Sequence, residues 1–313
     1  MNLIQRPIET RVDDLNVSEI VGELRALRTA AQKRRYRAAP PELPSRAATI
    51  ALVDGLSAAL YPRHFGPCGL RSRDVDSFVG RQLAETLASL RQQAELELRL
   101  NDEIEGVDHA ISRQAGEIVA AFAATLPKVR ALLDSDIRAA FEGDPSAQSI
   151  DEVIFCFPGV FAVVRHRLAH QLYQLGVPML ARIIAESAHS QTGIDIHPGA
   201  RIGEGFFIDH GTGVVIGETA IIGRNVRLYQ AVTLGAKRFE KDGGGALLKN
   251  YPRHPIVEDN VVIYAGATVL GRITLGRGSS IGGNVWLTHS VPPGSHVTQA
   301  IAREEAFHDG GGI

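Results

Sequence analysis

Acidic and histidine side chains occur together where a regular pattern in the second half of the chain is interrupted. Asp209 and His210 come directly before Gly211-Thr212-Gly213, and Asp195 lies 15 residues before His210. A neutral imidazole can accept a proton near pH 7 when a carboxylate orients its other ring nitrogen. His210 is therefore a candidate general base, and Asp195 is its candidate orienting carboxylate. Taken alone, the two residues also fit a surface or packed pair without a catalytic role.

A second interruption ends in Arg253 and His254, after a glycine-rich, charged stretch from Lys237 to Asn250. A guanidinium group can bind a carboxylate through two parallel hydrogen bonds, so Arg253 is a candidate clamp for an acidic ligand. A surface arginine in a loop is the commoner case. Long stretches without regular structure inside a compact repeat are usually functional or disordered.

The pattern that these residues interrupt is a six-residue period of aliphatic side chains. A strand would repeat every 2 residues and a helix every 3.6 residues, so neither alone explains this period. A period of six with glycines after the aliphatic position predicts a parallel β-helix of roughly five coils, with the aliphatic side chains stacked in its core. The 13 positions that keep the period on either side of the two interruptions are Ile196, Ile202, Ile208, Ile216, Ile222, Leu228, Leu234, Val257, Ile263, Val269, Leu275, Ile281 and Leu287.

The first part of the chain is helical in character, with Ala, Leu, Arg, Glu and Gln at helical apolar spacing. The predicted fold class is α+β, an N-terminal all-α helical domain followed by a left-handed parallel β-helix of hexapeptide repeats. The predicted segments are a loosely ordered arm at 1–44, the helical domain at 45–192, the β-helix at 193–290 with a loop excursion at 236–255, and a C-terminal tail at 291–313. Helix starts or loops are predicted at Pro62, Pro67, Pro127, Pro145, Pro158 and Pro178.

Composition narrows the function. The net charge of −2 over 313 residues argues against a nucleic-acid-binding protein, which needs a strongly basic face. No apolar run reaches the ~18 residues of a membrane span, and we expect a cytoplasmic protein. Cys68 and Cys156 have no metal or redox spacing. His166 and His170 have a spacing that can bind a metal, but without an accompanying Glu we favour packed or solvated helix residues and predict no metal site.

The residues around the candidate groups resemble the serine O-acetyltransferase family. The resemblance spans about residues 130–295 and rests on Asp195-Ile196-His197-Pro198-Gly199-Ala200, the stretch from Ile208 to Ala220, Arg253-His254-Pro255 and Val291-Pro292-Pro293-Gly294. It implies transfer of the acetyl group of acetyl-CoA to the hydroxyl of L-serine, giving O-acetyl-L-serine and CoA in cysteine biosynthesis. The expected mechanism is general-base catalysis without a covalent intermediate or a permanently bound cofactor.

The resemblance also implies roles for individual residues. One histidine is the general base with an aspartate partner, and a second histidine lies near the substrate. An arginine holds the serine carboxylate, two aspartates bind its amino group, and a further carboxylate belongs to the family motif. The implied residues are, as catalytic groups, His210, Asp195 and His254; as serine-binding groups, Asp144, Asp209, Arg253 and Glu218; and, along the coil edge for acetyl-CoA, Gly235, Ala236, Ala265, Gly266 and Gly283.

Assembly and partners follow from the same resemblance. Members of the family form trimers or dimers of trimers, so we expect His210 and His254 of one site to come from different subunits. The C-terminal Ile313 is expected to insert its carboxylate into O-acetylserine sulfhydrylase. The chain departs from the family at Gly235-Ala236, at the charged loop that follows, and after Pro293, so contacts with acetyl-CoA and with the sulfhydrylase are open there.

Three other functions stay open at the level of sequence. The nearest is acetyl transfer to another hydroxyl acceptor, such as homoserine or a sugar, because fold alone does not select the acceptor. A zinc carbonic anhydrase would need three convergent histidines, and the repeats show no close His pair in the expected setting. The third is a non-catalytic scaffold that recruits the sulfhydrylase.

Overall fold

The computed structural model describes residues 16–36, 39–101, 108–249 and 251–299 of the chain. By contacts the chain divides into two units, Met1–Glu42 and Leu43–Ile313. The first unit contains helix α1 (Val17–Arg35), where the Asn16 side chain caps the first turn and three basic residues occupy the last turn. The arm predicted at 1–44 therefore contains a helix. None of its residues is buried, so the helix relies on its caps and end charges rather than on packing within its unit.

The second unit begins with the helical domain. Serines cap α2 and α6, and prolines occupy the first turn of α3, α7 and α8, where the missing N–H costs nothing. Pro127 differs from the prediction, because it lies inside α5 rather than at a helix start. The buried face of α5, which includes Val129 and Leu133, continues past this proline and holds the helix together. The helices are α2 (Arg46–Leu60), α3 (Pro62–Phe65), α4 (Val75–Asn101), α5 (Asp108–Gly143), α6 (Ile150–Cys156), α7 (Pro158–Gln174) and α8 (Pro178–Thr192), with a 3₁₀ turn at Ser72–Asp74.

No single helix among the described residues has both the length and the apolar content to cross a membrane. The pair α6 and α7 reaches both together, but the two helices bend by 74° at their junction. Most of α7 is buried in the core of the helical domain.

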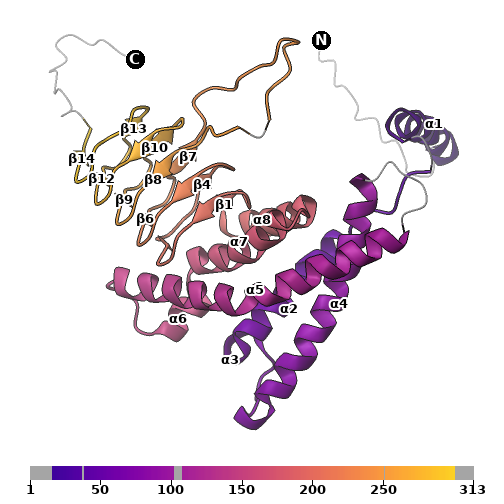
Figure 1. Cartoon of the computed structure of the whole chain (residues 1–313), viewed down its shortest axis with the longest axis horizontal. Coiled ribbons are helices and arrows are strands. Elements are labelled where there is room, and N and C mark those ends of the chain that lie inside the picture. Colours follow the sequence, from indigo (N-terminus) through magenta and orange to yellow (C-terminus); the bar gives the residue numbers. More distant parts are fainter. Residues whose placement is uncertain (1–15, 37–38, 102–107, 250, 300–313) are drawn as a thin grey trace, which may run out of the picture. The chain divides into compact units, whose positions relative to one another are not determined.

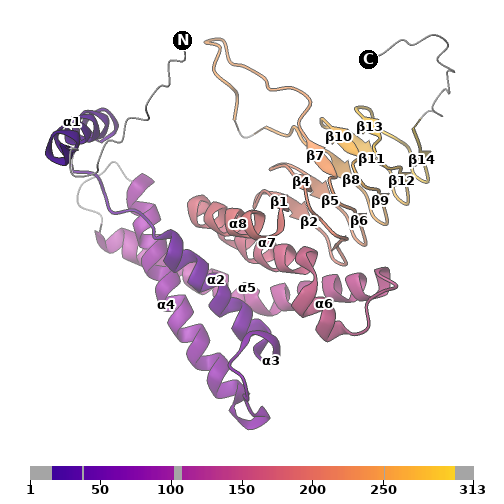
Figure 2. The same cartoon turned by 180° about the vertical axis from the view of Figure 1, so that it is seen from behind.

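The β-helix follows α8 and is built from very short strands, which are visible as a stack of coils in Figures 1 and 2. Three parallel sheets form its faces: sheet A (β1-β4-β7-β10-β13), sheet B (β11-β8-β5-β2) and sheet C (β14-β12-β9-β6-β3). The strands are β1 (Asp195–Ile196), β2 (Arg201–Ile202), β3 (Phe207–Ile208), β4 (Val215–Ile216), β5 (Ile221–Ile222), β6 (Arg227–Leu228), β7 (Thr233–Gly235), β8 (Ile256–Val257), β9 (Val262–Ile263), β10 (Thr268–Leu270), β11 (Thr274–Leu275), β12 (Ser280–Ile281), β13 (Trp286–Leu287) and β14 (His296–Val297).

The aliphatic period explains this architecture. The 13 periodic residues are the second residues of β1 to β13, and all except the half-buried Ile202 are buried. Ile196 pairs with Ile216, and Leu234 pairs with Val269, so residues in register stack directly above one another. The fold class is thus confirmed as a helical region followed by a left-handed β-helix.

Two boundaries of the β-helix differ from those predicted. β14 lies inside the predicted tail and pairs with β12, because Val297 continues the stack above Ile281. The loop between β7 and β8 extends away from the coils as an orange excursion in Figure 1. It contains one antiparallel bridge, between Lys241 and Leu247.

Helical domain and β-helix share one continuous hydrophobic core. A buried ion pair between Arg167 of α7 and Asp136 of α5 reinforces the junction. Arg167 also donates to the carbonyl oxygens of Ile202 and Gly203, and Asp136 accepts from the backbone N–H of Phe206. These bonds tie the end of α5 to the coil that carries β3.

Close packing fixes the same coil against α7. A Cβ added at Gly159 would lie 2.2 Å from the carbonyl oxygen of Ile208, so only glycine allows this approach. One turn further along α7, Nδ1 of His170 bonds to the carbonyl oxygen of Pro198 at 2.7 Å, and His166 is buried. The two helix histidines are therefore packed residues at the junction.

Candidate active site

The predicted site residues gather on two different edges of the β-helix. The His210 edge is formed by the segments that lead from sheet C to sheet A, residues 209–214, 229–232, 264–267 and 282–285. The His254 edge is formed by the segments that lead from sheet A to sheet B, residues 197–200, 217–220, 236–255 and 271–273. Sheet A separates the two edges.

On the His210 edge, a solvent-exposed imidazole is flanked by carboxylates. His210 has φ of 58°, which turns the chain sharply after β3, and 71% of its side chain is exposed. Its Nε2 lies 3.9 Å from Oδ1 of Asp209. The left-handed turn is completed by Gly211 and Gly213, both with positive φ, where a larger residue would be strained.

Asp144 reaches the same place from the helical domain, directly after α5. Its Oδ1 accepts from the backbone N–H and the hydroxyl of Ser146, at 2.8 and 2.7 Å. These two hydrogen bonds lower the pKa of Asp144, and the nearby charges of His210 and Arg227 lower it further. The carboxylate is thus ionised and close enough to sense the charge of His210.

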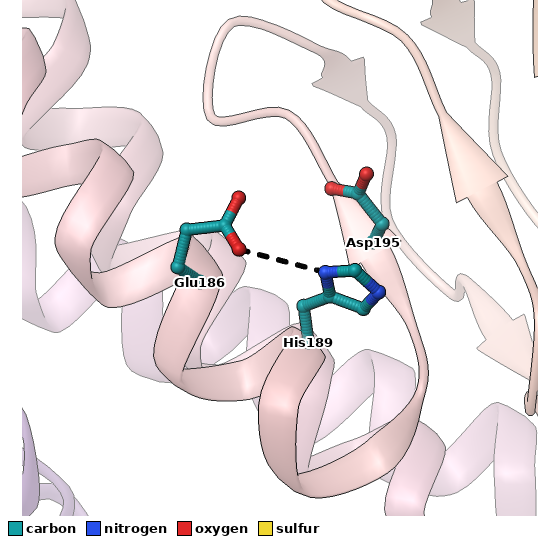
Figure 3. A group of neighbouring side chains, drawn as sticks. All are labelled: Glu186, His189 and Asp195. Carbon is teal, nitrogen blue, oxygen red and sulfur yellow. Dashed lines mark ion pairs between the residues drawn. The ribbon is translucent and has the colours of Figure 1, made fainter.

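Asp195 does not contact His210 in the single chain. It pairs in register with Val215, so this coil is 20 residues long (215 − 195) and His210 lies 5 residues short of the position above Asp195. Among the described residues, no hydrogen bond or ion pair joins the two side chains. The Asp195 carboxylate lies instead beside Glu186 and His189 at the end of α8, as Figure 3 shows.

On the His254 edge, Arg253 and Glu218 form a close ion pair. Nη2 of Arg253 lies 2.6 Å from Oε2 of Glu218, and the hydroxyl of Tyr173 donates to Oε1 of Glu218 at 2.9 Å. Burial alone would raise the pKa of Glu218, but the hydrogen bonds from Arg253 and Tyr173 lower it below its usual value. Glu218 is therefore an anion that orients the guanidinium of Arg253.

His254 is held by Thr219 in one tautomer. Oγ1 of Thr219 accepts from the backbone N–H groups of Arg253 and His254, at 2.9 and 3.1 Å. Its own proton is therefore directed to Nδ1 of His254, 2.9 Å away, and the Thr219 N–H also donates to this nitrogen at 3.1 Å. Nδ1 thus accepts, which leaves the proton of the neutral ring on Nε2.

The surroundings of His254 favour this neutral form. The side chain is buried, and burial lowers its pKa to about 4, with the positive charge of Arg253 acting in the same direction. At neutral pH, His254 is therefore a hydrogen-bond donor through Nε2, not a base. The ring packs on the backbone of the coil, because a Cβ at Gly217 would lie 2.0 Å from its Cδ2.

Sequence reasoning missed Thr219 and Tyr173. Thr219 stands between Glu218 and Ala220 in the motif that carried the resemblance, and a hydroxyl at a corner opposite a histidine is a signal that could have found it. Tyr173 comes from α7, and nothing in its local sequence links it to Glu218, 45 residues away.

The residues predicted for acetyl-CoA divide between the edges. Gly235 and Ala236 stand at the end of β7, and Ala265, Gly266 and Gly283 stand on the His210 edge. The latter three are stacked on successive coils, and the N–H of the next residue, Asn284, bonds to the carbonyl oxygen of Ala265. Gly266 has φ of 72° and faces Oδ1 of Asn284, so its glycine is required by the coil itself.

Comparison with known proteins gives a consistent result. The family model of the bacterial transferase hexapeptide (six repeats) matches residues 254–289. A plasmid serine acetyltransferase of Synechococcus elongatus is 58% identical over 275 residues, which cover 87% of this chain and 86% of that protein. A serine acetyltransferase of Mycobacterium tuberculosis is 53% identical over 162 residues, covering 52% of this chain and 67% of its own length.

Solved structures agree with these relatives. Serine acetyltransferase 1 of Entamoeba histolytica, in complex with L-cysteine, has a TM-score of 0.70 and 34% identity over 90% of this chain and 97% of that chain. A soybean serine acetyltransferase complexed with serine has a TM-score of 0.52 and 29% identity over 82% of this chain and 98% of that chain. With more than half of the residues identical over nearly all of one relative's length, the chain belongs to the serine acetyltransferase family.

Proposed function

We propose that this serine acetyltransferase forms O-acetyl-L-serine at a site where the His210 edge of one subunit meets the His254 edge of the next, with acetyl-CoA as the acetyl donor. The observation that carries the proposal is the pair of carboxylates, Asp144 and Asp209, around the exposed imidazole of His210. Two anions beside one base suit a substrate that carries an ammonium group next to a hydroxyl.

Serine would be held by both of its charged ends. Asp144 and Asp209 bind the ammonium group, and the guanidinium of Arg253 binds the carboxylate. Glu218 is a positioning residue, because its ion pair directs Arg253. Nε2–H of His254, beside Arg253, donates a further hydrogen bond to the substrate carboxylate. Fixing both ends places the hydroxyl against His210 and supplies orientation that free serine lacks.

His210 would then act as the general base. It takes the hydroxyl proton while the serine oxygen forms a bond to the thioester carbonyl carbon, which gives a tetrahedral intermediate. The carbon–sulfur bond then breaks, and the proton passes from the imidazolium to the departing CoA sulfur. Such a base contributes about 10²–10⁴-fold, or ~3–5 kcal/mol. Asp195 orients the imidazole once its side chain has rotated away from α8.

The trimer follows from the geometry of the coils. His254 packs on Gly217, and Gly217 follows His210 by 7 residues along the coil (217 − 210), an extended span of up to roughly 20 Å across sheet A. One chain therefore cannot place His210 and His254 on the same serine. A ring of three chains brings the His210 edge of each against the His254 edge of its neighbour and completes three sites.

Acetyl-CoA would extend along the His210 edge from the acetyl group outward. Ala265, Gly266 and Gly283 are stacked there without bulky side chains, so the pantetheine chain can approach the backbone. Gly235 and Ala236 of the neighbouring subunit would close the other side. The predicted contact of Ile313 with O-acetylserine sulfhydrylase lies outside the described residues and stays a prediction.

The proposal is tested by thiol release from acetyl-CoA by the purified protein with L-serine, with homoserine and with a sugar acceptor. We expect turnover on serine, and we expect His210→Ala to reduce kcat by about 10²–10⁴-fold. His296→Ala, which changes an exposed histidine on β14, is the matched control and should retain activity. Turnover on another acceptor alone would refute the serine pocket, and full activity of His210→Ala would refute the base.

A further inference from the structure

Three metal-binding side chains meet where α8 passes into β1. Glu186 and His189 stand one turn apart in the last two turns of α8, and Asp195 is the first residue of β1. One donor atom from each lies within 4.8 Å of the other two. Figure 3 shows both carboxylates and the imidazole facing the same space between the helix and the strand.

The chemistry of these donors suits a divalent transition metal. One imidazole nitrogen and two carboxylates are ligands of Zn²⁺, which binds them at about 2.0–2.2 Å and leaves a fourth position for water. Tetrahedral geometry needs the donor atoms about 3.4 Å apart, so they must approach by at most roughly 1.5 Å. The side chains of Glu186 and His189 are 42% and 45% exposed, and they can make this adjustment by rotation alone.

The local charges also favour a cation. Glu186 and Asp195 bring two negative charges, and the C-terminal end of α8 adds the partial negative charge of its last carbonyl groups. The opposing group is Arg182, whose Nη2 lies 3.2 Å from Oε1 of Glu186. Oε2 of Glu186 faces Nδ1 of His189 at 3.5 Å, so one carboxylate oxygen and the imidazole face each other without Arg182 between them.

We propose that Glu186, His189 and Asp195 form a binding site for Zn²⁺ or a similar divalent transition-metal ion, and that the bound ion inhibits the enzyme. Inhibition rests on the proposed function, because Asp195 is the carboxylate assigned to orient His210. A carboxylate that coordinates a metal at the end of α8 cannot also accept the hydrogen bond of His210. Metal binding and dyad formation are then mutually exclusive uses of one side chain.

Binding is tested first, without reference to activity. The full chain, with Cys68→Ser and Cys156→Ser because both thiols are exposed and thiolates bind Zn²⁺, is titrated with Zn²⁺ against a chromophoric chelator. We expect one site per chain, and His189→Ala and Glu186→Gln should each weaken it about tenfold or more. His296→Ala, another exposed histidine, is the control and should leave binding unchanged. Equal Zn²⁺ binding by all four proteins would overturn the site.

The inhibitory role is tested by the ratio of initial rates with Zn²⁺ and with a chelator. Rates are followed by loss of thioester absorbance, since thiol reagents bind zinc. We expect Zn²⁺ to lower the rate of the parent protein severalfold and to leave His189→Ala and Glu186→Gln near their own chelator rates. Equal inhibition of the parent and both variants would place the inhibitory metal elsewhere and refute the proposal.

The two arms separate this proposal from the proposed function. Serine acetylation is judged from rates in chelator alone, and the metal site is judged from Zn²⁺ binding by a protein that has met no substrate. A protein that binds Zn²⁺ through His189 but acetylates no serine would refute only the function and the inhibition. A protein that acetylates serine but binds no Zn²⁺ would refute only the metal site.

Discussion

We predict that two impaired variants, His210→Ala and His254→Ala, recover activity when their subunits are mixed. The two histidines lie on opposite edges of sheet A, and no described contact joins their groups within one chain. In a ring of three chains, each site takes His210 from one subunit and His254 from the next. A subunit that lacks one histidine still offers the other to a neighbour.

The size of the recovery follows from counting. In an equal, random mixture, a site is intact only if one defined subunit keeps His210 and its neighbour keeps His254. Each condition holds with a probability of one half, so about one quarter of all sites are intact (1/2 × 1/2). The mixture should therefore reach about 25% of wild-type activity, above the mean of its two parents.

The assay is thiol release after the variants have been unfolded together in urea and refolded, with wild-type protein treated in the same way. A mixture of His210→Ala with Asp209→Ala is the matched control, because both residues lie on the same edge of one chain. That mixture should stay at the mean of its parents. If the first mixture also shows no gain while the wild-type protein recovers, the two histidines do not meet across a subunit interface.

Three further outcomes test the His254 edge. Thr219→Val removes the acceptor of two backbone N–H groups, so urea unfolding should show a loss of about 2–4 kcal/mol and kcat/KM for serine should fall about tenfold, whereas Thr219→Ser should keep both near wild type. Gly217→Ala places a Cβ 2.0 Å from Cδ2 of His254, so the ring must move, and kcat/KM should fall about 10²-fold without loss of the helical circular dichroism signal. Because the pKa of His254 is about 4 in the folded state and about 6.5 in the unfolded state, the unfolded state binds more protons in this window and stability falls as pH falls. Between pH 7 and pH 5 this histidine should remove about 2 kcal/mol, and His254→Asn should show a correspondingly smaller loss; an equal loss in both proteins would contradict the burial argument.

Much of the scaffold could be predicted because its determinants are local and repeated. Each coil buries its aliphatic residues against the coils above and below, so Ile216 or Val269 has the same surroundings as its stacked neighbours. Pro158 and Pro178 likewise mark helix starts through their own backbone chemistry. Pro127 was assigned incorrectly, since packing of the whole α5 face outweighs the local cost of one proline.

The sequence by itself determined the β-helix, the chemical types in its interruptions and the resemblance to an acetyltransferase, since spacing and residue type need no distant partner. Only the tertiary structure decided which edge each group occupies, because that depends on how the insertions before β4 and β8 are summed around closed coils. It placed Asp195 beside His189 and not beside His210, since the first coil has 20 residues. It also brought Thr219 to His254 across 35 residues and thereby set the tautomer of the ring, a contact that no local pattern encodes.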